Sequence, residues 1–287
     1  MLRISEISFP GFGIGSFEVE SDAFSIGSIE IAWYALIITF GMILAVTYLI
    51  LRAGQVGINM DTIIDYALIT IPVGIIGARL YYVLTKLESF DSFSEAINIR
   101  NGGLAIYGGL LAGALSVFII SKVKKIPFLV IADCCTPGII LAQAIGRWGN
   151  FANGEAFGYE TDIFCRMGLN NILTGYKTVY VHPTFLYESL WNLIGFALVN
   201  LFYSKRKYDG QIFLFVFGWY GLGRMFIEAL RQDSLYTQIF GWEFRTSQVL
   251  AALIFTVCLG CLIYFAFRKP NKELYYHNNP KTSKKEK

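Results

Sequence analysis

The stretch IAWYALIITFGMILAVTYLIL at residues 31–51 decides the fold class, because it contains no charged side chain. A transmembrane helix needs about 20 mainly apolar residues in succession. A second uncharged run, VLAALIFTVCLGCLIYFAF, covers residues 249–267, and five further apolar stretches qualify, at 66–84, 104–120, 127–146, 185–203 and 212–230. These runs are continuous rather than alternating, which favours helices over the strands of a membrane β-barrel. The sequence therefore predicts an all-α integral membrane protein with about seven transmembrane helices.

The composition agrees with a protein whose surface faces lipid. Of the 287 residues, 55% are hydrophobic and only 16% are charged, whereas a soluble domain has about a quarter charged residues. Four of the five cysteines lie in apolar spans, so neither a disulfide framework nor a zinc site is expected, and the C-x-x-C at 258–261 is interpreted as packing. With only two histidines, His182 and His277, we do not expect metal chemistry based on histidine. The N-terminal residues lack the apolar core of a cleavable signal peptide.

The distribution of Lys and Arg predicts the orientation, because cytoplasmic loops carry the excess of these residues. Fourteen basic residues fall on one side of the seven predicted spans and seven on the other. This places the N-terminus outside and the C-terminus in the cytoplasm. The predicted organisation is an extracytoplasmic N-terminal arm at 1–30, a transmembrane catalytic domain at 31–267 with an outer segment at 148–183, and a basic, disordered cytoplasmic tail at 268–287.

This orientation brings several polar residues to one depth, near the outer ends of the spans. They are Arg79, Arg147, Arg224, Glu188, Glu228, Tyr34 and Tyr107. An arginine at the centre of a membrane helix costs roughly 2.5–3.5 kcal/mol on insertion scales. Three roles are open for such arginines: snorkelling to the headgroups, local pairing, for example of Arg224 with Glu228 one turn on, or binding of an anion. We favour a phospholipid headgroup, because the planar fork of arginine binds phosphate oxygens bidentately.

Two glycine-rich segments add to this pattern. The segment GRWGNFANGEAFG at 146–158 packs an arginine, two asparagines and a glutamate among glycines, which lets the backbone approach a ligand closely. In NGGLAIYGGLLAG at 101–113, Gly109 and Gly113 form a small-xxx-small pair that predicts close helix packing.

Five segments together resemble the bacterial prolipoprotein diacylglyceryl transferases. The segment at 146–158 resembles the signature of that family. HPTFLYE at 182–188, YGLGRMFIEALRQD at 220–233, GARLYYV at 77–83 and GGLAIYGGL at 102–110 resemble further blocks. The similarity runs from about Trp33 to Arg268.

The resemblance implies a reaction, its partners and a site. The family transfers the diacylglyceryl group of phosphatidylglycerol to the thiol of the lipobox cysteine in preprolipoproteins, releasing glycerol phosphate, in the bacterial cytoplasmic membrane. The resemblance implies no metal and no organic cofactor. The expected partners are phosphatidylglycerol, the signal peptides of preprolipoproteins and membrane lipid, with no nucleic acid. By motif, the implied catalytic residues are Arg147, Arg224, Glu155, Asn150, Tyr107 and Tyr34, and the implied substrate-binding residues are Arg147, Tyr220, Gly158, Arg79 and Glu188.

One residue departs from the family pattern. Some members have an essential histidine in the GGLxxHGG block, where this chain has Tyr107. A tyrosine with a pKa of about 10 is a poor base at neutral pH. Either Tyr107 only positions the lipid, or the arginines lower the thiol pKa enough that no strong base is needed. His182, before Pro183, is interpreted as structural.

Two other functions compete with this one. A transferase that makes phospholipid headgroups usually needs paired aspartates for a metal, and the sequence has no such cluster. A transporter or flippase predicts related halves and a polar site at the midplane, whereas the polar residues here are expected in the outer leaflet.

Overall fold

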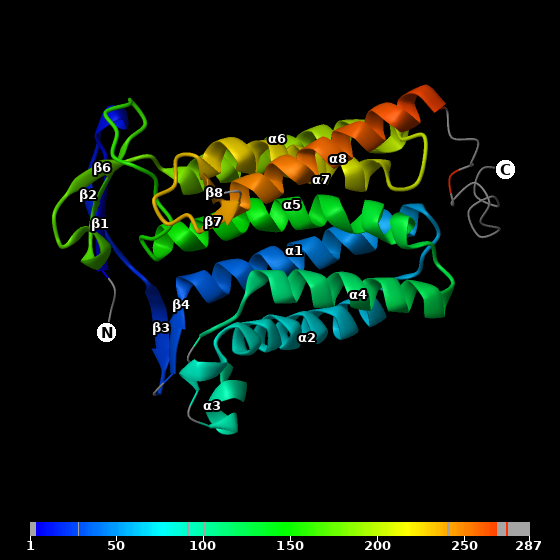
Figure 1. Cartoon of the computed structure of the whole chain (residues 1–287), viewed down its shortest axis with the longest axis horizontal. Coiled ribbons are helices and arrows are strands. Elements are labelled where there is room, and N and C mark those ends of the chain that lie inside the picture. The colour runs from blue at the N-terminus through cyan, green and yellow to red at the C-terminus, as the bar shows by residue number, and fades with distance from the viewer. Residues whose placement is uncertain are drawn as a thin grey trace. The chain divides into compact units, whose positions relative to one another are not determined.

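The computed structural model describes residues 4–27, 29–90, 92–99, 102–239, 242–268 and 274. The chain is mostly helical (Figure 1), and it divides into two compact units. The first unit consists of Met1–Tyr48 with Cys135–Glu273, and the second of Leu49–Cys134 with Leu274–Lys287.

The helices of the first unit include three that lie side by side, α6 (Thr184–Phe202), α7 (Gln211–Glu228) and α8 (Thr246–Arg268) (Figure 1). A stacked pair, Trp191 and Trp219, joins α6 to α7, with ring centroids 4.3 Å apart. Each indole N–H donates to the main-chain carbonyl of the other tryptophan at 2.9 Å. The reciprocal bonds fix the register between the two helices.

Two further helices cross the boundary between the units. Helix α1 spans Trp33–Gln55 and helix α5 spans Phe128–Ala152. Helix α5 extends beyond the predicted span at 127–146, so Arg147 and Asn150 lie on its last turns. The glycine-rich signature therefore begins as helix rather than as loop.

The first unit also contains strands, so the protein is mostly helical rather than all-α as predicted. Strand β1 (Ile4–Phe9) lies between β2 (Ile14–Glu20) and β5 (Met167–Asn170), and β6 (Val179–Val181) completes an antiparallel sheet. Apolar residues from this sheet and from the start of α6 form one core, namely Ile7, Met167, Leu169, Val181 and Phe185. The first unit also contains two hairpins, β3–β4 (Asp22–Ile26, Ile29–Ala32) and β7–β8 (Tyr236–Ile239, Trp242–Arg245). Its 3-10 turns are Pro10–Phe12, Ile172–Thr174 and Tyr203–Lys205.

A buried asparagine ties this sheet to the signature segment. The Asn171 amide donates to the Ser5 hydroxyl at 3.1 Å and to the Gly154 carbonyl at 2.8 Å. Gly154 has a φ of +60°, and a Cβ there would lie 2.2 Å from the Ser5 hydroxyl oxygen. Only glycine fits this position, because it needs both a left-handed backbone and an absent side chain.

The second unit is built on two packed helices, α2 (Met60–Thr85) and α4 (Ile106–Lys124), with the short turn Leu87–Ser89 and helix α3 (Phe93–Ile97) between them. The helices are closest at Gly77 and Gly108, where a Cβ on Gly108 would lie 2.3 Å from the Gly77 carbonyl oxygen. Gly109 is also close to Gly74, but the nearest atom to a Cβ on Gly113 is 3.7 Å away. The predicted close contact is therefore real, but it is centred on Gly108 rather than on Gly113.

We expect Gly108→Ala to destabilise the protein, whereas Gly113→Ala on the same helix does not. An added methyl at Gly108 forces the two backbones apart, and overpacking typically costs about 1–3 kcal/mol. At Gly113 the methyl has room, and replacing glycine by alanine within a helix gains roughly 0.5–1 kcal/mol. Thermal denaturation in detergent measures both changes, and equal midpoints for the two variants would contradict the assigned contact.

Six helices of the described residues are long and apolar enough to cross a membrane, which makes this a multi-pass membrane protein. They are Trp33–Gln55, Met60–Thr85, Ile106–Lys124, Phe128–Ala152, Thr184–Lys205 and Thr246–Arg268. Helix α7, at the predicted span 212–230, contains Arg224 and Glu228 and is not among them. The predicted disorder of the tail at 268–287 falls outside the described residues, apart from Arg268 and Leu274.

Candidate functional site

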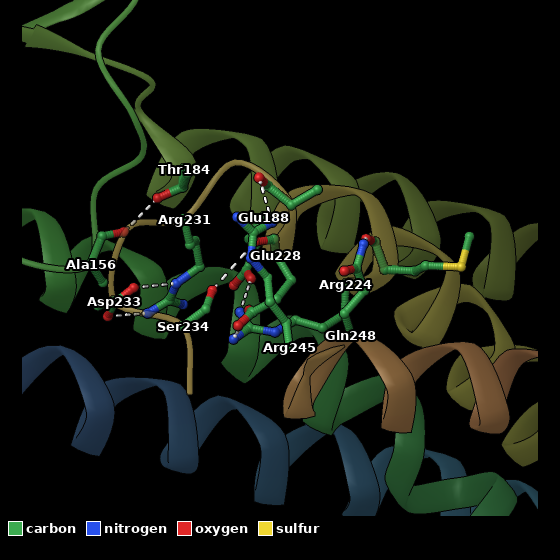
Figure 2. A network of polar contacts seen from close by, with 12 residues as sticks. Ala156, Thr184, Glu188, Arg224, Glu228, Arg231, Asp233, Ser234, Arg245 and Gln248 are labelled. Atoms are coloured by element: carbon green, nitrogen blue, oxygen red, sulfur yellow. Dashed lines mark hydrogen bonds and ion pairs between the residues drawn. The ribbon is translucent and has the colours of Figure 1, made fainter. Parts of the chain in front are cut away.

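Four charged side chains from three helices of the first unit meet at one point. Arg147 comes from α5, Glu188 from the second turn of α6, and Arg224 and Glu228 from the last two turns of α7. Figure 2 shows Glu188, Arg224 and Glu228 together. One Glu188 oxygen pairs with Arg147 and the other with Arg224, and Arg224 also pairs with Glu228 at 2.6 Å. We call these four residues the charged cluster.

The charged cluster is largely withdrawn from solvent and internally balanced. The Glu188 and Glu228 side chains are 5% and 2% exposed, and those of Arg147 and Arg224 are 22% and 14% exposed. The cluster contains two arginines and two glutamates, so the repulsion between the arginines is offset. The local pairing of Arg224 with Glu228, one of the predicted alternatives, is present. The arginines are thus held in fixed positions before any ligand arrives.

A chain of amide contacts extends the charged cluster into the signature segment. Arg147 Nη1 donates to the side-chain oxygen Oδ1 of Asn150 at 3.3 Å, and the Asn150 side-chain amide donates to Glu155 at 3.2 Å. Asn153 also donates to Glu155, at 3.0 Å. Arg147 Nη2 makes no hydrogen bond with the described residues. Because a guanidinium has five N–H donors, Arg147 keeps donors for a ligand.

Main-chain hydrogen bonds bring the three predicted motifs together. Gly158 N–H donates to the His182 carbonyl at 3.0 Å, and Tyr159 N–H donates to the Leu230 carbonyl at 2.8 Å. A Cβ on Gly158 would lie 2.7 Å from the Cβ of His182 and 2.8 Å from the Leu230 oxygen. The segment after the signature therefore lies between the start of α6 and the end of α7, and Gly158 is where the three segments cross.

His182 contacts Gly158 through its main-chain carbonyl and Tyr187 through its imidazole. Its Nδ1 lies 3.3 Å from the Tyr187 hydroxyl. Burial lowers the pKa of His182 below its ordinary value, so the imidazole is neutral at pH 7. These contacts are consistent with the structural interpretation.

A small pocket beside the charged cluster contains a third arginine that the sequence reasoning missed. The pocket is lined by Arg147, Asn150, Ala156, Thr184, Phe185, Glu188 and Arg231. Arg231 donates to both oxygens of Asp233, at 2.9 and 2.7 Å (Figure 2). Burial raises the pKa of Asp233, but the hydrogen bonds from Arg231 outweigh it and the pKa falls below its usual value. In the comparison of loop charges, Arg231 is one of the seven basic residues on the outer side. It also lies in the third motif, three residues after Glu228.

Two tyrosines predicted for the site lie next to it. The Tyr34 ring packs against Gly149, where a Cβ would be 2.7 Å from Tyr34 Cδ2. Tyr220 lies one turn before Arg224 on α7 and interacts electrostatically with Glu188, Arg224 and Arg147. The first unit therefore brings together all predicted site residues that belong to it.

The remaining two predicted residues, Arg79 and Tyr107, belong to the second unit. The guanidinium of Arg79 is occupied by four main-chain carbonyls. Nε donates to Ala96 at 2.7 Å, Nη2 to Glu95 at 2.9 Å, and Nη1 to Gly102 and Gly103 at 2.7 and 3.0 Å. These contacts favour a structural role, and substrate binding by Arg79 stays a prediction. Tyr107 is half-buried in the first turn of α4.

We expect Arg79→Lys to destabilise the connection between α2 and α4 although it conserves charge. A lysine ammonium has three donors at one point, so it leaves some of the four carbonyls unsatisfied, at about 1–3 kcal/mol for each buried group. Limited proteolysis of residues 86–105 should become faster and the thermal midpoint should fall. Arg52→Lys, at a guanidinium that donates to the Gln55 side chain, is the control. A variant as stable as wild type would argue against the carbonyl contacts.

Comparison with known proteins agrees with this arrangement. Residues 21–264 match the family model described as prolipoprotein diacylglyceryl transferase. A relative from Clostridium perfringens, named phosphatidylglycerol–prolipoprotein diacylglyceryl transferase 1, is 43% identical over 255 residues, which cover 87% of this chain and 96% of the relative. Relatives with the same enzyme name from Enterococcus faecalis (40% identical, 93% of this chain and 97% of the relative) and Clostridioides difficile (42%, 87% and 96%) are similar. The chain belongs to the prolipoprotein diacylglyceryl transferase family.

Proposed function

We propose that this protein transfers the diacylglyceryl group of phosphatidylglycerol to the lipobox cysteine of preprolipoproteins, the first step of lipoprotein maturation. Membership of the family supports the reaction, since the relatives are named for these two substrates. The observation that carries the proposal is the convergence of three sequence motifs on one cluster of arginines and carboxylates.

The proposed reaction is a displacement at a glycerol carbon of the lipid. The cysteine sulfur forms a bond to this carbon while the bond from the carbon to the phosphate oxygen breaks. The bonding electron pair leaves with the phosphate, so the products are a thioether-linked lipid and glycerol phosphate. The thiol must lose its proton, because the thiolate is the nucleophile. The protein contributes by stabilising the charge that develops on the phosphate and by holding both substrates together.

We assign roles to the charged cluster accordingly. Arg147, which keeps free donors and lines the pocket, binds the lipid phosphate. Arg224 stabilises the leaving phosphate or the thiolate. Glu188 and Glu228 hold the two arginines in place, and Glu155 orients Arg147 through Asn150. Arg231, which lines the same pocket, adds a further donor for the anion.

The remaining predicted residues have supporting roles in this proposal. Tyr34 and Tyr220 form the wall next to the charged cluster, and Gly158 allows the three motifs to cross. From the family motifs we propose that Tyr107 positions the lipid, whereas the four carbonyl contacts of Arg79 favour a structural role for that residue.

The proposed membrane arrangement has seven spans, because α7 is added to the six helices that are long and apolar enough to cross a membrane. The two charged residues of α7, Arg224 and Glu228, pair with each other, and Arg224 also pairs with Glu188, which lowers the cost of placing them at membrane depth. The loop charges support a cytoplasmic C-terminus and an N-terminal arm outside the bacterial cytoplasmic membrane. The arm at 1–30 and the outer segment at 148–183 would then lie on the side of the charged cluster, and the tail at 268–287 on the other.

Transfer of labelled lipid to a peptide tests the function. Purified protein receives phosphatidylglycerol labelled in its acyl chains and a peptide with a lipobox cysteine. We expect label on the cysteine, and none on a control peptide with serine at that position. An unlabelled cysteine, with protein that is folded, would refute the proposal.

The substitution Tyr107→Phe tests the proton-transfer alternative. The phenol is a poor base at neutral pH, so we expect the variant to keep most of its activity, with a change confined to KM for the lipid. Initial rates at several lipid concentrations measure this. A loss in kcat of more than about 100-fold, the size of a general-base contribution, would instead assign the hydroxyl a part in proton transfer.

A further inference from the structure

A cavity of about 220 Å³ lies between α6, α7 and α8, away from the charged cluster. Five apolar side chains line it, namely Val199 and Phe202 of α6, Ile212 and Phe215 of α7, and Leu262 of α8. All three helices belong to the first unit.

One end of this cavity is basic. Lys205, Arg206 and Gln211 complete its lining, and Lys207 follows in the same turn. The Lys205 side chain is exposed, and among the described residues no carboxylate pairs with it. Arg206 is buried over the Tyr203 ring and donates to the Tyr203 carbonyl at 3.0 Å. Arg206 is therefore held in place, and Lys205, whose Nζ lies 5.9 Å from the centroid of the Phe202 ring, is an exposed cation at this end of the cavity.

The cavity is distinct from the proposed active site. Glu188 and Lys205 lie near opposite ends of α6 and its 3-10 extension, and a rise of 1.5 Å per residue separates them by about 25 Å. This distance is close to the thickness of the hydrocarbon core of a bilayer, about 30 Å. A lipid that reacts at the charged cluster cannot place its headgroup at Lys205.

The lining and the charge together select the occupant. The volume is below the roughly 300–1,000 Å³ of pockets that enclose a whole small ligand, so it fits part of a molecule. A soluble anion would not use the five apolar side chains, and an uncharged lipid would not use Lys205. Basic pockets between transmembrane helices on the cytoplasmic side bind the headgroups of anionic lipids.

We propose that the cavity between α6, α7 and α8 binds an anionic phospholipid that is not consumed, with one acyl chain against the apolar lining and its phosphate at Lys205. Such a lipid holds the ends of the three helices together and stabilises the protein by binding its folded state. The site goes beyond the proposed reaction, because nothing is transferred there.

Native mass spectrometry of the detergent-solubilised, full-length protein tests this site with lipids that are not the transfer substrate. Phosphatidic acid is compared with phosphatidylcholine of the same acyl chains. We expect the wild-type protein to retain phosphatidic acid preferentially and to gain thermal stability from it. Equal retention of the two lipids would overturn the proposed role of Lys205.

Two variants localise the binding. Lys205→Gln should weaken phosphatidic acid binding by about fivefold, the effect of one basic residue near an anionic lipid, while Lys177→Gln, at an exposed lysine of the outer segment, should not. Val199→Phe fills the cavity and should weaken the binding of both lipids. Unchanged binding in both Lys205→Gln and Val199→Phe would refute the site.

Two controls separate the outcomes. Inorganic phosphate at millimolar concentration should neither stabilise the protein nor displace the lipid, and full protection by phosphate alone would show an anion site without a lipid. Diacylglyceryl transfer by Lys205→Gln in detergent should equal that of wild type, which shows that the variant is folded. Lipid binding at this cavity can be measured even if the protein has no transfer activity. The proposed lipid site and the proposed transfer reaction can therefore be refuted independently of each other.

Discussion

Replacing Glu188 by glutamine is expected to lower diacylglyceryl transfer by about 100-fold or more and to destabilise the protein. Glu188 pairs with Arg147 through one oxygen and with Arg224 through the other. Glutamine has nearly the same shape but no charge, so Glu228 is left as the only carboxylate for two arginines. Breaking a buried ion pair by removing one partner costs about 3–5 kcal/mol, and losing one preorganised electrostatic contact typically costs 10²–10³ in rate.

Two measurements distinguish misfolding from loss of catalysis in this variant. The initial rate of label transfer reports on catalysis, and the thermal midpoint in detergent reports on stability. Glu188→Asp keeps the charge with a shorter side chain, and we expect it to recover more stability than activity. Glu18→Gln, at an exposed carboxylate on β2, is the matched control. If Glu188→Gln were as active and as stable as wild type, the bridging carboxylate would have no role.

Replacing each arginine of the charged cluster by lysine should separate their roles. Lysine keeps the charge but loses the planar fork. Arg224 pairs with Glu188 and Glu228 through different nitrogens, which one ammonium cannot reproduce. We expect Arg224→Lys to lower kcat by about 100-fold, because the leaving phosphate loses a contact made in the transition state.

For Arg147→Lys we expect the larger effect on KM for phosphatidylglycerol. Arg147 has donors left for a ligand and is more exposed than Arg224, so its contact with the lipid phosphate is made before the reaction begins. An interaction of this kind appears in KM rather than in kcat. Arg166→Lys, at a guanidinium that contacts the carbonyls of Asp162 and Ile163, should change neither constant. Identical kinetic changes in Arg147→Lys and Arg224→Lys would contradict the division of roles.

The helices could be predicted well from the sequence, but their ends could not. Helix α2 begins at Met60, six residues before the apolar run at 66–84, because the Asn59 side chain caps it by accepting from Thr62 N–H. Hydropathy does not detect residues 60–65 as part of the helix, because Asp61 and Asp65 are charged. Hydropathy also does not detect the polar last turns of α5, which contain Arg147 and Asn150.

The strands were missed because their partners are far apart in the sequence. Strand β1 pairs with β5 through Glu6–Asn170, Ile7–Leu169 and Ser8–Gly168. Strands β5 and β6 have only four and three residues, too short for an alternating pattern to stand out. The Asn171 amide, which donates to Ser5 of β1 and to the Gly154 carbonyl, is a further tie that a pattern of apolar residues does not reveal.

The members of the candidate site could be predicted where their depth along the predicted spans decides their position. They could not be predicted where hydrogen-bond partners decide it. Charges on spans of opposite direction pointed to Arg147, Glu188 and Arg224 at one level, and the structure brings these three together. Depth could not reveal that Arg79 is occupied by four carbonyls. It also could not place Arg231, which follows α7 and reaches the pocket through a loop.

The position of β1 in the middle of its sheet sets an order of events during synthesis. Strand β2 follows β1 almost at once, but β5, its other neighbour, comes about 160 residues later, which corresponds to about 8–30 s at 5–20 residues per second. Throughout that interval the inner edge of β1 is an open template for pairing with other chains. The N-terminal hairpin therefore keeps one unpaired strand edge until β5 has been synthesised, and we expect closure of the sheet to be a late step of biogenesis that follows synthesis of the signature segment at 146–158.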